Sequence, residues 1–545
     1  MTREAADMAS VTKWGKRGIA LGAGAAATAL VLTGCASSSV SDTELNGLSI
    51  GTTDKITSLD PAGSYDNGSF AVQNQVFPFL MNTPVGSPDV EPDIATKAEF
   101  TNPTTYEVTL KDGLEFANGN KLTSSDVKFS FDRELKINNE NGPQSLLANL
   151  KSIDTPDDTT VVFNLDHADQ TWPQVLSSPA GPIVDEDVFS ATKLTSADDI
   201  VKGKAFAGQY QISSYKENDT IQYKTNPKYD GLLGKAKTDE VTASYYTKET
   251  DLKLAVQEGD VDVAYRSLTP TDISDLRGDD SVKVTDGPGG EIRYVVFNFK
   301  TQPFGTGQDD ADEAKALAVR QAAADVVDRA QLAKEVYNDT FTPLYSMVPD
   351  GLTGAVQPFK EMYGDGDGGA DVSKAKKTLS DAGVTGKVQL DIQYAPDHYG
   401  SASDDEYALL KQQLEDSGLF TVNIQSTVYT TYAQERTKDA YPVYQLGWFP
   451  DFSDADNYLS PFFTKENFVQ NHYDDPEIQD LIAKEQAESD PDKRADLIEQ
   501  AQEREATQIS TLPLLQGKSV AVAGKDVKGL TLDASFKFRY ATLSK

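Results

Sequence analysis

The chain is poor in the residues that carry most enzyme and metal chemistry. Among 545 residues it has one cysteine, Cys35, and three histidines, His167, His398 and His472, which stand far apart. A single cysteine excludes a disulfide within the chain. The sequence also lacks a nucleophile elbow, a phosphate-binding loop, a metalloprotease motif and a dinucleotide fingerprint. We therefore expect no catalytic site, no metal and no cofactor, with each histidine a surface or hydrogen-bonding residue.

Positive charge is scarce as well. The chain has 50 Lys and Arg residues against 85 Asp and Glu residues, which gives a net charge of −35. Such a chain repels nucleic acid and anionic lipid, so we expect neither as its main partner. With 38% hydrophobic residues it is too apolar for general disorder. Its length corresponds to three or four domain-sized units of about 150 residues.

Long hydrophobic runs are absent. The longest weakly apolar run, residues 19–32, is shorter than the roughly 20 residues that a membrane-spanning helix needs. It follows the basic residues Lys13, Lys16 and Arg17 and ends in small residues, which is typical of a secretory signal. We therefore expect residues 1–34 to be a signal peptide and the protein to act outside the cytoplasm.

The only cysteine lies where this run ends. Leu32-Thr33-Gly34-Cys35 resembles the bacterial lipobox, and the resemblance implies cleavage before Cys35 and lipidation of its sulfur. Residues 35–46 are small and polar, which favours a flexible tether. We expect a lipoprotein that is held at the cell membrane by Cys35.

The remaining sequence alternates between strand and helix patterns. Thr105–Leu110 places apolar residues at every second position, which predicts a strand. Residues 311–337 carry an apolar seam at helical spacing. Asp371 can cap a helix, and Asp475 and Asp490 each precede a proline, which is the pattern of a helix start.

Residues 388–448 carry the most regular pattern. Strands are predicted at Val388–Tyr394, Val422–Tyr429 and Val443–Leu446, with a helix ending at Gly418 and a short polar helix between them. This βαβαβ order implies parallel strands with right-handed crossovers. Ligands of parallel sheets bind beyond the carboxyl ends of strands, and residues 447–451 lie at such an end.

Three aspartates and several aromatic residues follow this last strand. Asp451, Asp454 and Asp456 lie among Trp448, Phe449, Phe452 and Tyr458. A carboxylate in a partly dry aromatic site suits an ammonium group. The same residues could instead cap the next helix and fill the core. The local pattern leaves both interpretations open.

Several ordered motifs then resemble a known family. Residues 98–135 resemble the signature of the family 5 extracellular solute-binding proteins, the dipeptide, oligopeptide and nickel receptors of ABC importers. Further matches run along the mature chain, at Ser58-Leu59-Asp60-Pro61, 207–230, 257–263, Asn298, Phe304, Arg320-Gln321-Ala322, Asp328-Arg329 and 527–530. The resemblance covers essentially the whole mature sequence.

This resemblance implies a fold. Such receptors are α/β proteins with parallel and mixed sheets, of the two-lobed periplasmic-binding-protein type II, class C, with a hinge between the lobes. By resemblance, the first lobe takes residues 47–85, 206–292 and 514–545. The inserted domain takes residues 86–205, and the second lobe takes residues 293–513.

The resemblance also implies site residues. In peptide-binding members, an extended peptide pairs with strand-like segments between the lobes. The matching positions here are Gly447, Trp448 and Phe449 as backbone partners and Asp451 as the partner of the α-ammonium. Residues 64–68, with Tyr65 and Asn67, match the segment that lines the cleft from the other lobe.

One element of the dipeptide receptors is missing. They place an arginine near Tyr394–His398 to bind the peptide carboxylate, but here only His398 is basic. Arg266 or Arg293 could substitute. Without a bidentate clamp, strict dipeptide selection is not expected, and a longer peptide in a wetter cavity fits better.

The expected function is therefore capture of peptides, mainly oligopeptides, and their delivery to an ABC permease and ATPase complex by a monomeric, lipid-anchored protein. The same fold could bind another solute, such as an oligosaccharide or a nickel or other metal chelate. A surface hydrolase, with a triad assembled from distant residues, and a lipoprotein adhesin or signalling receptor are the remaining alternatives.

Overall fold

A computed structural model describes residues 47–266, 268–400, 402–465 and 467–545. The predicted signal peptide, Cys35 and the tether up to residue 46 lie outside these ranges. Among the described residues, no helix has both the length and the apolar character needed to cross a membrane.

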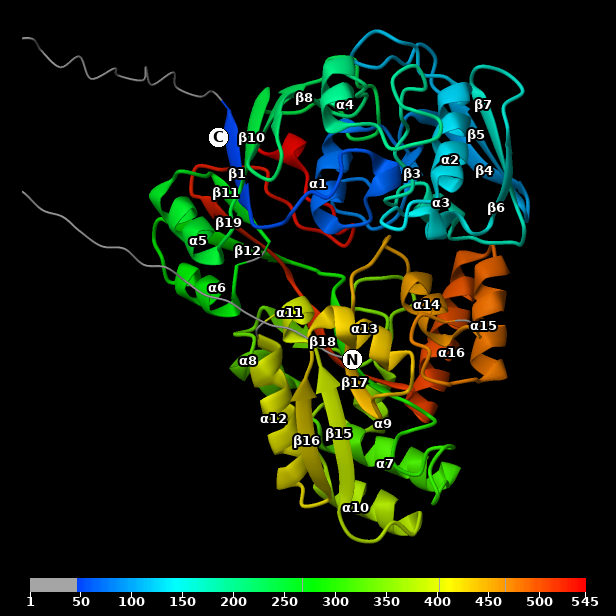
Figure 1. Ribbon diagram of the computed structural model, residues 1–545, viewed down its shortest axis with the longest axis vertical. Coiled ribbons are helices and arrows are strands. Elements are labelled where there is room, and N and C mark those ends of the chain that lie inside the picture. Colours follow the sequence, from blue (N-terminus) through cyan, green and yellow to red (C-terminus); the bar gives the residue numbers. More distant parts are fainter. Residues whose placement is uncertain (1–46, 267, 401, 466) are drawn as a thin grey trace, which may run out of the picture. The chain divides into compact units, whose positions relative to one another are not determined.

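The first lobe is built on a seven-stranded sheet (Figure 1). Its strand order is β12-β19-β11-β1-β10-β9-β8, and the central strand β1 pairs in parallel with both β10 and β11. The strands are β1 (Leu48–Thr52), β8 (Tyr210–Lys216), β9 (Thr220–Thr225), β10 (Glu240–Tyr245), β11 (Val263–Tyr265), β12 (Val282–Gly287) and β19 (Ser519–Gly524), and the helices are α1 (Asn67–Val76), α5 (Glu249–Glu258) and α6 (Pro270–Arg277). The first and last strands of the described region, β1 and β19, thus belong to one sheet.

A four-stranded antiparallel sheet with order β4-β5-β7-β6 occupies the predicted insertion. Its elements are β4 (Ala95–Asn102), β5 (Thr105–Leu110), β6 (Leu150–Asp154), β7 (Thr160–Leu165), α2 (Ser124–Ile137) and α3 (Trp172–Val175), preceded by the short pair β2 (Met81–Asn82) and β3 (Glu91–Pro92). The following helix, α4 (Ala197–Gly203), packs against β8 of the first-lobe sheet. The strand predicted at Thr105–Leu110 is confirmed, with Tyr106, Val108 and Leu110 buried. Thr123 and Asp126 start α2 with a capping box.

The second lobe has a six-stranded mixed sheet with order β14-β18-β13-β17-β15-β16. Its strands are β13 (Ile292–Phe297), β14 (Phe341–Pro343), β15 (Val388–Tyr394), β16 (Phe420–Ser426), β17 (Val443–Trp448) and β18 (Thr511–Gly517). Its helices are α7 (Glu313–Val326), α8 (Arg329–Glu335), α9 (Pro358–Met362), α10 (Val372–Asp381), α11 (Pro396–Tyr399), α12 (Ala402–Asp416), α13 (Tyr429–Arg436), α14 (Ser460–Phe463), α15 (Pro476–Ala487) and α16 (Pro491–Gln508).

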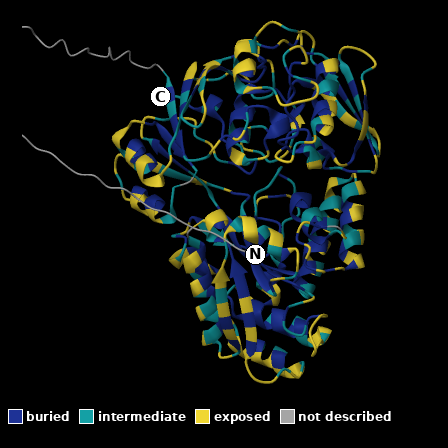
Figure 2. Cartoon of the chain, in the orientation of Figure 1, coloured by how far each residue is buried: buried dark blue, intermediate teal, exposed yellow. Residues whose placement is uncertain are grey.

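The predicted βαβαβ run is confirmed. β15 pairs in parallel with β16 and with β17, and α12 and α13 are the crossovers between them (Figure 1). Three bounds differ from the prediction. β16 ends at Ser426 rather than at Tyr429, which is the first residue of α13. β16 begins at Phe420, whose buried ring extends the strand backwards, and β17 continues through Trp448, so only Phe449 to Asp451 lie beyond its end. β17 is buried up to Leu446 and Gly447, whereas β15 and β16 carry exposed residues between buried ones (Figure 2).

The seam predicted for residues 311–337 is two helices rather than one. Val327 is extended after α7, and the Asp328 side chain accepts a hydrogen bond from the Gln331 backbone to start α8. The helix starts predicted from Asp371, Asp475 and Asp490 are confirmed, since each side chain caps its helix.

Two chain segments connect the sheets of the lobes. One runs from Gly287 to Ile292 and the other passes through Lys518, between β18 and β19. A Cβ atom on Gly289 would lie 2.0 Å from the Gly517 carbonyl oxygen, so the two connections touch where only glycine fits. The expected boundary at residue 514 falls inside β18, and the chain changes sheets at Lys518.

Candidate ligand-binding site

Both lobes and their connections line one cavity of about 520 Å³. This volume lies within the roughly 300–1,000 Å³ of ordinary small-ligand sites. The first lobe contributes Asn67 and Phe70, the second lobe contributes Phe449 and Asp451, and Lys518 lines it at the connection. The cavity is the candidate site because it brings the residues after β17 opposite the start of α1.

Asp451 is held in this cavity by a small set of neutral groups. Its backbone N–H donates to Asn457 Oδ1 at 3.0 Å, and Asn457 Nδ2 donates back to the carboxylate at 3.1 Å. The Tyr65 hydroxyl, from the first lobe, donates to the other carboxylate oxygen. Among the described residues, no Lys, Arg or His forms an ion pair with Asp451. Tyr65 does not itself line the cavity but contacts Asp451, which does.

The surroundings of Asp451 disfavour its charge. Burial raises the pKa of its carboxyl group, and the hydrogen bonds from Tyr65 and Asn457 lower it only in part. Burial and the charge of Asp451 raise the pKa of Tyr65, so its hydroxyl stays a donor. A desolvated carboxylate with neutral partners gains most from a cationic ligand group.

The other two aspartates of the sequence cluster have structural roles. Asp454 caps the short helix η3 (Ala455–Tyr458) and binds Arg494 through two nitrogens, at 2.9 and 2.7 Å. Asp456 is buried and accepts hydrogen bonds from Ser460 and Gln486. The helix-capping interpretation therefore applies to Asp454, while Asp451 faces the cavity.

Gly447 and Trp448 lie in β17 and do not line the cavity. The Trp448 ring contacts Phe462 and Phe468 at centroid distances of 5.2 and 5.6 Å, and its Nε1–H donates to Asn457 at 3.0 Å. Gly447 pairs with Arg293, and a Cβ atom there would lie 2.5 Å from Arg293 Nη1. Both residues shape the wall behind Phe449 and Asp451.

Arg293 and His398 line the cavity, and the charge of Arg293 already has a carboxylate partner. Arg293 is 5% exposed, pairs with Glu291 and donates to the Tyr399 carbonyl at 3.0 Å. The His398 ring stacks on Tyr429 at 3.5 Å. Partial burial, and then the charge of Arg293, lower the pKa of His398, which favours the neutral imidazole.

The structure adds Lys537, which sequence reasoning missed. It lines the first-lobe wall, where its ammonium donates to the Ser177 carbonyl at 2.9 Å and to Asn82 Oδ1 at 3.2 Å. Burial and the neighbouring Arg539 lower its pKa to about 7. Nothing near Lys537 in the sequence distinguishes it from other lysines, since its partners come from distant segments.

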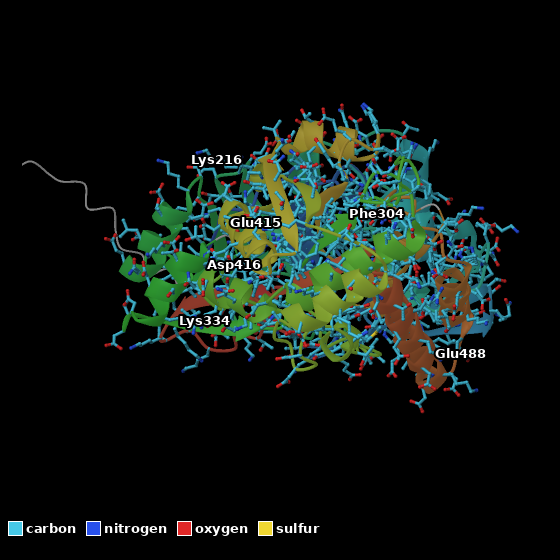
Figure 3. The ribbon with its side chains drawn as sticks, turned by 90° about the horizontal axis from the view of Figure 1, so that it is seen from below. Lys216, Phe304, Lys334, Glu415, Asp416 and Glu488 are labelled. Carbon is cyan, nitrogen blue, oxygen red and sulfur yellow. The ribbon has the colours of Figure 1, made fainter. Side chains whose placement is uncertain are left out.

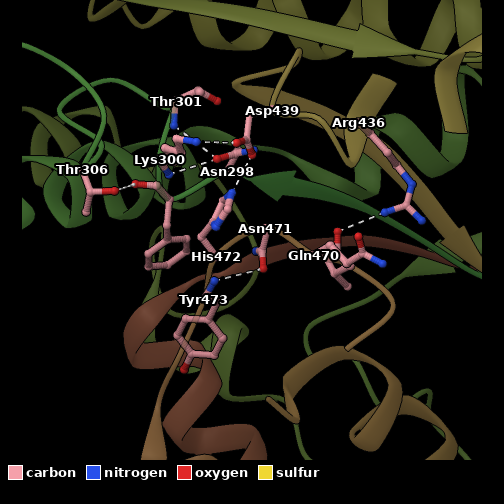
Figure 4. Close-up of polar contacts among 12 residues, drawn as sticks. Asn298, Lys300, Thr301, Thr306, Arg436, Asp439, Gln470, Asn471, His472 and Tyr473 are labelled. Atoms are coloured by element: carbon pink, nitrogen blue, oxygen red, sulfur yellow. Dashed lines mark hydrogen bonds and ion pairs between the residues drawn. The ribbon is translucent and has the colours of Figure 1, made fainter. Parts of the chain in front are cut away.

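His472 is a hydrogen-bonding residue, as its isolation in the sequence suggests. Its Nε2 lies 2.6 Å from Asp439, which also accepts from Asn298 and Lys300 (Figure 4). Burial alone raises the pKa of Asp439, but the bonds from Lys300, Asn298 and His472 lower it to about 2. Within the part of the chain that the structure describes, no group of three or more His, Cys, Asp or Glu residues could hold a metal ion.

Comparison with known proteins identifies the family. The sequence profile of the bacterial extracellular solute-binding proteins, family 5 Middle, matches residues 89–470. The chain belongs to this family. The match confirms the family resemblance that the motifs at residues 98–135 and after residue 207 indicated.

Relatives match over most of their length. The chain is 24% identical over 503 residues to the probable D,D-dipeptide-binding periplasmic protein DdpA of Escherichia coli K12, covering 89% of this chain and 92% of that protein. It is 24% identical over 515 residues to the dipeptide-binding protein of the same strain, covering 88% and 90%. The unliganded open form of the periplasmic murein tripeptide-binding protein MppA has a similar fold, with a TM-score of 0.77, 19% identity and coverage of 92% and 97%. The fold is that of the two-lobed type II periplasmic binding proteins.

Proposed function

We propose that this family 5 protein is the substrate-binding component of an ABC importer and captures peptides in the cavity between its lobes. Closure of the lobes around the ligand would present it to a membrane permease and its ATPase. The protein would act as a carrier and not as an enzyme. Peptides of several residues fit better than strict dipeptides, because both arginines that line the cavity already have a carboxylate partner, Arg266 with Asp54 and Arg293 with Glu291.

One observation carries this proposal. Asp451 is a partly enclosed carboxylate that faces the cavity, and its partners Tyr65 and Asn457 are neutral. A peptide α-ammonium would supply the missing charge and donate hydrogen bonds to it. Because Tyr65 and Asp451 come from different lobes, the same carboxylate would link ligand binding to closure.

Three parts of the proposal concern the protein's surroundings. We propose that residues 1–34 are removed, that Cys35 is lipidated, and that residues 35–46 tether a monomer to the outer face of the cell membrane. The lipobox sequence Leu32-Thr33-Gly34-Cys35 supports this assignment. Incorporation of labelled palmitate into the wild type, and its loss in Cys35→Ser, would test it.

The ligand class can be tested by gentle purification, acid release and mass spectrometry of whatever the cavity holds. We expect a mixture of peptides with free N-termini, which Asp451→Asn no longer retains. The matched control is Asp416→Asn, since Asp416 is exposed on α12 outside the cavity (Figure 3). Release of a single sugar or metal chelate would contradict the peptide proposal and favour another solute.

A further inference from the structure

The cavity contains a second unpaired charge, opposite in sign to Asp451. Among the described residues, Lys537 forms no ion pair, although the chain has 85 acidic and 50 basic residues. Its ammonium donates instead to two neutral oxygens, the Ser177 carbonyl and Asn82 Oδ1. Lys537 is partly buried. Charges that are withdrawn from water are normally paired, so a lysine with only neutral acceptors lacks an anion.

The groups packed around Lys537 do not provide that anion. The rings of Phe79 and Phe70 lie 5.3 and 6.0 Å from its nitrogen, and Arg539 adds a second positive charge. Asp93 and Asp533 are the nearby carboxylates that favour the charged lysine.

Both of these carboxylates are engaged elsewhere. Asp93 accepts from the Tyr229 hydroxyl at 2.7 Å and from Asn82 at 2.9 Å. Asp533 accepts from the backbone N–H groups of Gly86 and Ser535 at 2.7 and 2.9 Å. Neither lies within ion-pair distance of Lys537, so its own charge stays uncompensated.

The cavity wall beside Lys537 suits an oxyanion. Thr83, Ser177 and Ser535 line the cavity there, and hydroxyl groups can donate to a carboxylate. Asp451, from the second lobe, lines the same cavity. The cavity therefore has a free carboxylate on one lobe and an unpaired ammonium on the other, which complements a ligand that carries both charges.

We propose that Lys537 binds a carboxylate of the ligand, so that a peptide lies with its ammonium at Asp451 and a carboxylate at the first-lobe wall. This inference rests on the proposed peptide function. It assigns the anion-binding role to a residue outside the 394–398 segment, where partial burial lowers the pKa of His398 and no arginine is present.

Defined peptide libraries test this role. The probes are tetrapeptides of Ala, Val, Leu, Ser and Gln with free C-termini, the same peptides as C-terminal amides, and amides that also contain Glu. Retention by the purified protein in equilibrium dialysis is quantified by mass spectrometry. The variants are Lys537→Gln, Lys537→Arg and, as the matched control, Lys334→Gln on the exposed surface of α8 (Figure 3).

The wild type and Lys334→Gln should retain free acids about tenfold better than amides, because a charge-assisted hydrogen bond is lost on amidation. Lys537→Gln should lose this preference, and Lys537→Arg should keep most of it. Equal retention of Glu-containing amides and free acids would support a side-chain carboxylate as the bound group. An unchanged acid preference in Lys537→Gln would overturn the role of Lys537.

A pH series separates binding by charge from a structural role. Since the pKa of Lys537 is about 7, the wild-type preference for free acids should fall as the pH rises through this value, whereas Lys537→Arg should keep its preference. A preference that falls equally in both proteins would contradict the proposal. If the wild type retained no peptide in any library, the peptide function itself would be wrong.

Discussion

Two carboxylates of the first and second lobes, Asp60 and Asp451, show how the same group serves structure in one region and a ligand in another. Asp60 is fully buried and binds Arg133 of α2 through two nitrogens, at 2.8 and 2.5 Å. It also accepts from the Thr195 backbone at 2.6 Å. Asp451 has only neutral partners and faces a cavity. A satisfied buried charge holds the fold, and an unsatisfied one at a cavity indicates a ligand.

This contrast explains part of the family signature. The segment Ser58-Leu59-Asp60-Pro61 and the helix that ends the 98–135 signature meet in the Asp60–Arg133 pair. The pair ties the inserted sheet to the first lobe, far in sequence from the residues after β17. These two motifs therefore stabilise the first lobe and do not contact the ligand cavity through this pair.

The largest expected effect is on stability. Asp60→Ala leaves the Arg133 guanidinium buried without its partner and should lower the free energy of unfolding by about 3–5 kcal/mol. Chemical denaturation followed by circular dichroism measures this. The control is Asp132→Ala on the same helix, which removes an exposed ion pair with Lys128 and should cost at most about 0.5 kcal/mol. Equal losses in the two variants would show that the Asp60 pair has no special structural role.

At the cavity, we expect a loss of ligand affinity without a loss of stability. Asp451→Asn should weaken binding of N-terminally free peptides by about 2–5 kcal/mol, because the ligand ammonium loses its charged partner. The variant should unfold at the wild-type denaturant concentration or slightly above it, since it removes a carboxylate whose ionisation the fold disfavours. Isothermal titration calorimetry measures the affinity, and chemical denaturation measures the stability. A destabilised variant with normal affinity would show that Asp451 serves the fold rather than the ligand.

The pH dependence of binding sharpens the electrostatic part of the comparison. The pKa of Asp451 is raised in the unliganded protein, so the site holds its proton more tightly than an ordinary aspartate does. A peptide ammonium requires the ionised form, and affinity should fall with decreasing pH, by at most about tenfold per unit below that pKa. Asp451→Asn should not show this acid-side loss. Identical pH profiles for the two proteins would contradict the role of the carboxylate.

The smallest expected effect concerns the contact between the lobes. Tyr65→Phe removes the hydroxyl that donates to Asp451 and should weaken peptide binding by about 0.5–1.5 kcal/mol. We expect stopped-flow fluorescence to show most of this loss in the dissociation rate, because the contact joins the two lobes beside the ligand cavity. A faster association rate with unchanged dissociation would argue against this role for Tyr65.

Much of the fold follows from the sequence because its signals are local. Period-two burial at Thr105–Leu110 and the Asp-Pro helix starts at Asp475 and Asp490 depend on neighbouring residues only. The break at Val327 was missed because an alanine-rich seam continues across it, while the Asp328 cap restarts the helix. When a capping residue lies within a continuing helical pattern, the sequence alone does not decide whether the helix continues or restarts.

The site was predictable only in part. The family motif pointed to Asp451, and the structure places it in the cavity, while Trp448 and Gly447 lie behind the wall because β17 continues through them. Lys537 could not be found from sequence. Its significance comes from Ser177 and Asn82, more than 350 residues away, and from the absence of a nearby free carboxylate.

The most direct test of the central claim combines a ligand change with a protein change. Binding of the free-acid tetrapeptides and of their N-acetylated forms is measured for the wild type, Asp451→Asn and the Asp416→Asn control. Acetylation should weaken binding about 30-fold or more in the wild type and the control. The affinity of Asp451→Asn should be the same for acetylated and free peptides. If acetylation weakened all three proteins equally, Asp451 would not hold the peptide ammonium.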